Sequence, residues 1–151
     1  GTVTDIDSTT SANLEAAYSV GPVLLQGQYI QTNFDRGAAG DISLEGYYAQ
    51  IGWVVTGERH RYGDTVGVFN SPRPRGPWGA VELAARYSVL DLSEGVLRSS
   101  GEARDSTLGV NWFIGRNLRL SANYIHSEVD ANDPTRDRDV DVVAARAQVD
   151  F

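Results

Sequence analysis

The chain has 151 residues, of which 41% are hydrophobic and 22% charged, a composition typical of a folded domain. It has no cysteine, which excludes a disulfide framework, a thiolate nucleophile and a zinc–thiolate site, and its net charge of −7 argues against a nucleic-acid-binding surface. No apolar run approaches the roughly 18 to 20 residues of a transmembrane helix, whereas the alternating strands of a transmembrane β-barrel fit the sequence.

Apolar and polar side chains alternate along seven segments, and a period of two predicts β-strands. No long segment shows helical spacing. The predicted fold class is therefore all-β and antiparallel. The seven predicted strands are residues 13–20, 23–31, 44–56, 80–90, 106–114, 117–128 and 139–151.

The connections between these strands alternate in length. Gly21-Pro22 and Gly115-Arg116 predict tight turns, whereas the loops after the second, fourth and sixth strands are longer and more polar. Short turns at one rim and long loops at the other are typical of bacterial outer-membrane barrels. The three longer loops are predicted at residues 33–41, 91–103 and 130–141.

Aromatic residues gather near the ends of the apolar faces, where the aromatic girdles of a membrane barrel lie. In a soluble β-sandwich or a lipocalin-like barrel, the same faces would instead pack into a core. The mostly uncharged polar face and the apolar last strand favour contact with lipid. The expected interface aromatics are Tyr18, Tyr29, Trp53, Tyr87, Trp112, Tyr124 and Phe151.

Four stretches resemble the phosphate-selective porin O/P family. Residues 79–92 (GAVELAARYSVLDL) are similar to a late strand of that family, and residues 106–113 (STLGVNWF) to its next strand. Residues 117–126 (NLRLSANYIH) resemble the strand after that, and YYAQ at 47–50, leading to TGE at 56–58, matches the family upstream. The order and spacing of these motifs extend the resemblance from about residue 40 to the end.

The resemblance implies a sixteen-stranded, usually trimeric barrel in the outer membrane of a Gram-negative bacterium. Such a porin passes small anions such as phosphate by passive diffusion through an arginine-lined lumen; it is not an enzyme, and no cofactor is expected. About seven strands are present, and an odd number cannot close a single-chain barrel with both ends in the periplasm. Residues 1–151 are therefore predicted to be the C-terminal part of the barrel. An eighth strand within residues 1–11 would instead permit a small closed barrel.

The resemblance also implies the partners of the protein. They are outer-membrane lipid and lipopolysaccharide, small anionic solutes, the other subunits of a homotrimer and, through the terminal Phe151, the outer-membrane assembly machinery.

All thirteen basic residues are arginine. If Phe151 faces lipid, the alternation points Arg86, Arg119 and Arg146 into the lumen, because an arginine facing lipid near the midplane costs about 2 to 4 kcal/mol. Inward arginines attract anions by charge and by bidentate hydrogen bonds. The alternative is that they pair with acids on the same face. Those acids are Glu15, Glu82 and Asp150.

A long connection, residues 57–78, separates the third and fourth strands. Counting strand directions from a periplasmic C-terminus places it on the periplasmic side, and the resemblance implies that it folds into the pore and constricts it. It could bind oxyanions through a cationic cluster, with Glu58 and Asp64 as counter-charges; the alternative is a solvated, flexible connection. The cluster consists of Arg59, His60, Arg61, Arg73 and Arg75.

No enzyme constellation is present: the sequence has no nucleophile elbow, no P-loop and no dinucleotide fingerprint. The spacing of His60 and His126 does not predict a metal site, and His126 is expected at the outer rim. Residues 130–141 predict a solvated acidic loop, with divalent-cation binding beside lipopolysaccharide as the alternative. Two other functions stay open, a small non-channel outer-membrane barrel for adhesion or lipid binding and a soluble β-sheet binding module.

Overall fold

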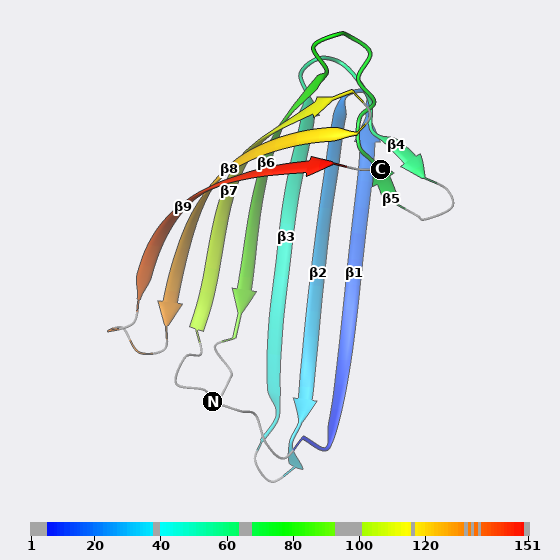
Figure 1. Cartoon of the computed structure of the whole chain (residues 1–151). Helices are drawn as coiled ribbons and strands as arrows, with labels where there is room; N and C mark the ends of the chain where they lie inside the picture. The colour runs from blue at the N-terminus through cyan, green and yellow to red at the C-terminus, as the bar shows by residue number, and fades with distance from the viewer. Residues whose placement is uncertain are drawn as a thin grey trace.

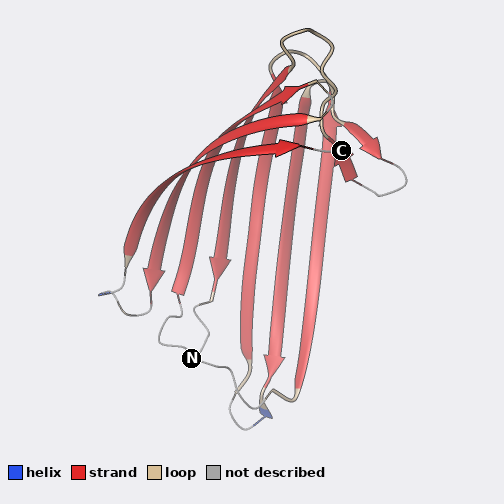
Figure 2. Cartoon of the chain, in the orientation of Figure 1, coloured by secondary structure: helices blue, strands red, loops and turns tan. Residues whose placement is uncertain are grey.

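The computed structural model describes residues 6–37, 40–63, 68–92, 101–115, 117–131, 133, 135 and 137–149, and it consists almost entirely of strands (Figure 2). Among these residues, no helix is long and apolar enough to cross a membrane. The strands are β1 (Ser8–Val20), β2 (Val23–Asp35), β3 (Ile42–Val54), β4 (Arg61–Gly63), β5 (Val68–Asn70), β6 (Ala80–Asp91), β7 (Gly101–Ile114), β8 (Leu118–Ala131) and β9 (Arg138–Val149).

Seven of the strands form one antiparallel sheet in the order β1-β2-β3-β6-β7-β8-β9, so that each pairs with its neighbour in the sequence (Figure 1). The tight turns predicted at Gly21 and Gly115 are present, and both glycines have a positive φ (57° and 66°), a conformation that residues with a Cβ rarely adopt. The all-β, antiparallel prediction is confirmed.

The predicted strand ends were wrong in several places, mostly because the strands are longer than expected. Pairing continues to Ser8, before the predicted start of the first strand, and to Asp35, Gly101 and Ala131, in stretches that were predicted to be loops. These extensions are mostly polar and so lack the regular apolar alternation on which the prediction depended. Residues 8–11 extend β1 and do not form a separate eighth strand.

The connection between β3 and β6 contains a second, two-stranded sheet, β4–β5, which the sequence did not predict. Tyr62 and Phe69 stack edge to face across it, with their ring centroids 5.2 Å apart. Three-residue strands are too short for a periodic signal. The connection lies at the end of the sheet where β7 turns into β8 (Figure 1).

The strand register gives the large sheet two different faces. We call the side with Tyr18, Trp53 and Trp112 the apolar face and the side with Arg86, Arg119 and Arg146 the polar face, because directly paired residues share a face.

The exposure of the two faces is the reverse of that in a soluble protein. On the apolar face Leu108 and Val143 are 62% and 83% exposed, whereas on the polar face Glu82 and Asn111 are buried. A small buried apolar cluster (Val54, Ala80 and Phe113) also lies on the polar face. In the part of the chain that the structure describes, the apolar side chains therefore do not form the dry core that a soluble sandwich requires.

The aromatic residues of the apolar face form two oblique lines across the strands. Tyr29, Tyr47, Tyr87 and Tyr124 lie near the middles of their strands. Tyr18, Trp53 and Trp112 lie near the strand ends that lead into the two tight turns and the connection between β3 and β6. All seven are at least 37% exposed. Phe151, the remaining expected interface aromatic, lies outside the described residues.

Candidate functional site: two arginine pockets

Three strands bring the first group of predicted arginines to one pocket of about 220 Å³. Arg86 comes from β6, Arg119 from β8 and Arg146 from β9, and the register places all three on the polar face. Hydroxyl and amide side chains, including those of Asn111 and Ser121, complete the lining. The shared face predicted from the alternation is therefore present.

The alternative required these three arginines to form ion pairs with acids, and they do not. The guanidinium of Arg86 lies 4.0 Å from the ring centroid of Tyr48, and that of Arg119 lies 5.1 Å from the ring of Phe113. Nη2 of Arg119 donates a hydrogen bond to Oδ1 of Asn111 at 2.9 Å. Within the described ranges, none of the three forms a salt bridge.

Two of the acids proposed for that pairing lie within the described residues. Glu82 contacts His60 and Asn111, and Glu15 is exposed on the edge strand β1. Asp150 lies outside the described residues.

The second group of arginines lines a separate pocket of about 420 Å³ within the connection. Arg59, Arg61, Arg73 and Arg75 all border it, although 12 positions separate Arg61 from Arg73 in the sequence. His60 and Glu58 complete the charged lining; Asp64, the other expected counter-charge, lies outside the described residues. Four guanidinium groups around a cavity of this size can attract and bind an oxyanion.

Glu58 is the buried counter-charge of this pocket. Burial alone would raise the pKa of its carboxyl group, but the Thr56 hydroxyl and the Arg75 backbone N–H donate hydrogen bonds to it, and the Arg75 charge is nearby. The net result is a pKa below the ordinary value of a glutamate, so Glu58 stays ionised at neutral pH. It ties the start of the connection to its end, and it offsets one of the four arginine charges.

A third pocket, of about 410 Å³, shares Arg73 with the pocket of the connection and Arg119 with the pocket of the sheet. A chain of polar contacts also links them: Nε2 of His60 lies 2.7 Å from Oε2 of Glu82, and Nδ2 of Asn111 donates to Oε1 of Glu82 at 2.7 Å. Sequence reasoning missed this link. The only signal for it in the sequence was that Glu82 and Asn111 are polar residues on the same predicted face of their strands.

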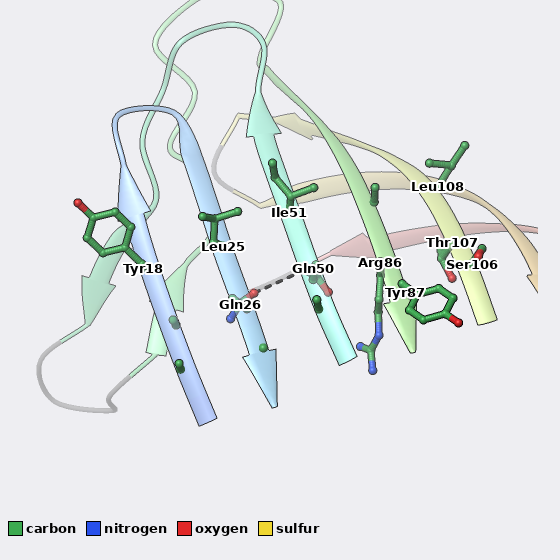
Figure 3. A pocket seen from close by; sticks show the side chains of 15 residues that line it. Tyr18, Leu25, Gln26, Gln50, Ile51, Arg86, Tyr87, Ser106, Thr107 and Leu108 are labelled. Atoms are coloured by element: carbon green, nitrogen blue, oxygen red, sulfur yellow. Dashed lines mark hydrogen bonds between the residues drawn. The ribbon is translucent and has the colours of Figure 1, made fainter. Parts of the chain in front are cut away.

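A hollow of about 690 Å³ is of a different kind. It lies mainly over the apolar face of β1, β2, β3, β6 and β7, where Ala16, Gly27 and Ala49 leave space beside the larger Tyr18, Leu25, Ile51 and Leu108 (Figure 3). Arg86 is the only charged residue of its lining. An apolar hollow on an exposed face offers no binding site for an anion.

Comparison with known proteins places the chain in a family. The family model of the phosphate-selective porins O and P matches residues 1–151. Porin O of Pseudomonas aeruginosa is 31% identical over 128 residues, which cover 78% of this chain and 29% of that protein. An uncharacterized protein of Caulobacter vibrioides is 35% identical over 117 residues, 70% of this chain and 23% of that protein. The chain thus spans less than a third of either relative.

The predicted resemblance is confirmed by the match over the whole chain: the protein belongs to the phosphate-selective porin O and P family of Gram-negative outer-membrane proteins.

Proposed function

We propose that the chain forms part of the wall of an outer-membrane channel through which small anions such as phosphate diffuse passively. The observation that carries this proposal is the pocket of three arginines on the face opposite the exposed apolar one, together with the pocket of four arginines in the connection that contacts this face through His60 and Glu82. In the proposed channel the apolar face touches acyl chains and the polar face touches water.

The strand lengths and the sheet edges support this placement. A tilted transmembrane strand needs about 9 to 11 residues, and the seven strands of the large sheet have 12 to 14. The outer edges of β1 and β9 have no partner strand within the described residues. Unpaired backbone groups are not tolerated in lipid, so we propose that further strands pair with both edges and close a barrel.

The aromatic residues near the strand ends support the same orientation. We propose that the line of Tyr18, Trp53 and Trp112 lies at the periplasmic membrane–water interface. The homotrimer and the assembly role of the terminal strand, both implied by the family, stay predictions.

We further propose that residues 57–78 lie on the periplasmic side and narrow the channel. Their contacts with the polar face, through His60 and through the pocket shared by Arg73 and Arg119, support this arrangement. The net charge of −7 does not oppose anion preference, because ions in a channel respond to charges within about a Debye length, 8 to 10 Å.

The test is the zero-current potential in a salt gradient across a planar bilayer that contains the protein carrying this chain. The expected result is a higher permeability for the anion. Arg59→Ala combined with Arg61→Ala is expected to lower the anion-to-cation permeability ratio about threefold, because two unit charges close to the path are lost. Arg104→Ala is the matched control, since Arg104 lies on the apolar side and pairs with Glu102 and Asp130.

A cation-selective or non-conducting native protein would contradict the proposed function. An unchanged permeability ratio in the double variant would instead show that Arg59 and Arg61 do not contribute to anion preference.

A further inference from the structure

We propose that His60 and Glu82 form a proton-sensitive latch that seats the arginine-bearing connection on the polar face and makes anion preference depend on pH. This inference rests on the proposed function, because it names His60 as a residue that sets the selectivity of the same pathway. The latch is the contact between Nε2 of His60 and Oε2 of Glu82.

The contact joins two separate parts of the molecule in a buried setting. His60 belongs to the connection and Glu82 to β6, 22 positions later. Their side chains are only 7% and 10% exposed, and the two atoms lie 2.7 Å apart. Oε2 of Glu82 is the polar atom that Nε2 contacts, and the two side chains attract each other as an ion pair when the imidazole is protonated. Burial strengthens such an attraction because water screens it less.

Both ring nitrogens of His60 face oxygen atoms. Nε2 faces the Glu82 carboxylate, and Nδ1 lies 3.4 Å from the backbone carbonyl oxygen of Asn70, which can only accept a hydrogen bond. A neutral imidazole carries one N–H, whereas the imidazolium ion carries two. The doubly protonated ring therefore matches both of its neighbours.

On the other side of the latch, Glu82 is fixed to the sheet. Its Oε1 accepts the hydrogen bond of Asn111, whose own Oδ1 accepts hydrogen bonds from Nη2 of Arg119 at 2.9 Å and Oγ of Ser121 at 2.8 Å. Gly52 leaves the space that the carboxylate occupies, because a Cβ at that position would lie 3.3 Å from Oε2. The latch thus connects the cluster in the connection with one of the wall arginines.

The charged groups around His60 come from three elements. The connection contributes Glu58 and four arginines, β6 contributes Glu82, and β8 contributes Arg119 through Asn111. Arginine stays charged at every accessible pH and Glu58 stays ionised. Histidine is the residue type of this set that can change its charge between about pH 5 and 8. The four arginines of the connection are Arg59, Arg61, Arg73 and Arg75.

The sign of the effect follows from the charge of the pair. With a protonated His60 the pair is neutral, and the arginines determine the local field. Once the proton is lost, the pair carries the single negative charge of Glu82, which opposes anion entry and no longer holds the connection. Anion preference is therefore expected to fall as pH rises through the range in which histidine ordinarily titrates, roughly pH 5 to 8.

The experiment measures the anion-to-cation permeability ratio from zero-current potentials at intervals over that pH range. The permeability ratio of the native protein is expected to fall about two- to threefold across this pH range, which is the effect of one unit charge near the path. His60→Gln is expected to show the low ratio at every pH, and His60→Arg the high ratio at every pH. Glu82→Gln, which keeps an acceptor for Asn111, is expected to exceed the native ratio throughout.

His126→Gln is the matched control. His126 is the only other histidine of the chain and pairs with Asp141 and Glu128 on the apolar side. It should keep the native pH profile.

The two proposals fail in different ways. An anion-selective channel with a flat pH profile, or with the same profile in His60→Gln as in the native protein, would overturn the latch and leave the proposed function standing. A channel without anion preference at any pH would overturn the proposed function itself. Failure of His60→Arg to restore the high ratio would also contradict the latch, because that variant keeps the charge.

Discussion

Ile51→Arg is expected to destabilise the folded protein in a bilayer by about 2 to 4 kcal/mol, the cost of an arginine that faces lipid near the midplane. Ile51 lies on the apolar face, 44% exposed, and pairs with Leu25 and Ala85 in the middle of the sheet. In lipid the guanidinium would have no water and no counter-charge. Unfolding by guanidinium chloride of the protein refolded in phospholipid vesicles measures the loss of folding free energy.

The neighbouring residue provides the control for this substitution. Gln50 has the opposite parity and pairs with Gln26 and Arg86 on the polar face. Gln50→Arg places the same side chain one residue away in water, so its folding free energy should stay within about 1 kcal/mol of the native value, and its anion preference should rise. Equal destabilisation at both positions would show that the two faces are in contact with the same solvent.

Gly79→Ala is expected to destabilise the protein by at least about 2 kcal/mol, because the added methyl group has no space and the backbone conformation is unfavourable for alanine. Gly79 has a φ of +88°, and a Cβ there would lie 2.2 Å from the backbone oxygen of Phe113 in β7. The next residue, Ala80, begins β6 and is fully buried. The clash would therefore separate the connection from the sheet.

Two glycines of the connection separate the effect of the steric clash from that of the backbone strain. Gly57 also has a positive φ (+89°) but nothing within 4 Å of its Cβ position, so Gly57→Ala tests the backbone strain alone. Gly76 has open space and no positive φ, so Gly76→Ala should be nearly neutral. The expected order of stability is Gly76→Ala, then Gly57→Ala, then Gly79→Ala, measured by the same titration. If Gly79→Ala were as stable as Gly57→Ala, the close approach to β7 would be disproved.

The order of the strands and the division of the faces could be predicted from the sequence because both depend on local alternation. Leu83, Arg86 and Trp112 take the faces that parity gave them, since a sheet allows only two directions for a side chain. The tight turn at Gly115 could also be predicted from the sequence, because glycine permits the positive φ that the turn requires.

The rest depended on contacts between distant residues, which periodicity does not encode. The strand extensions from Ser8 and from Gly101 are specified by pairing with a neighbour and not by their own composition. The pocket that brings Arg61 beside Arg73 follows from the path of an irregular connection. The contact of His60 with Glu82 needs the position of that connection on the sheet, so the alternation predicted only the face of Glu82 and not its partner.

The most direct test of the account is the solvent that each face of β6 meets. The chain has no cysteine, so each substitution introduces a single thiol into it. Ala84→Cys and Ser88→Cys, on the polar face, are predicted to react with a charged, water-soluble thiol reagent and to change the channel current. Leu83→Cys and Ala85→Cys, on the apolar face, are predicted to react only with a reagent that dissolves in the bilayer. The reverse pattern, or equal reaction at all four positions, would contradict an arginine-lined aqueous path bounded by an apolar face in lipid.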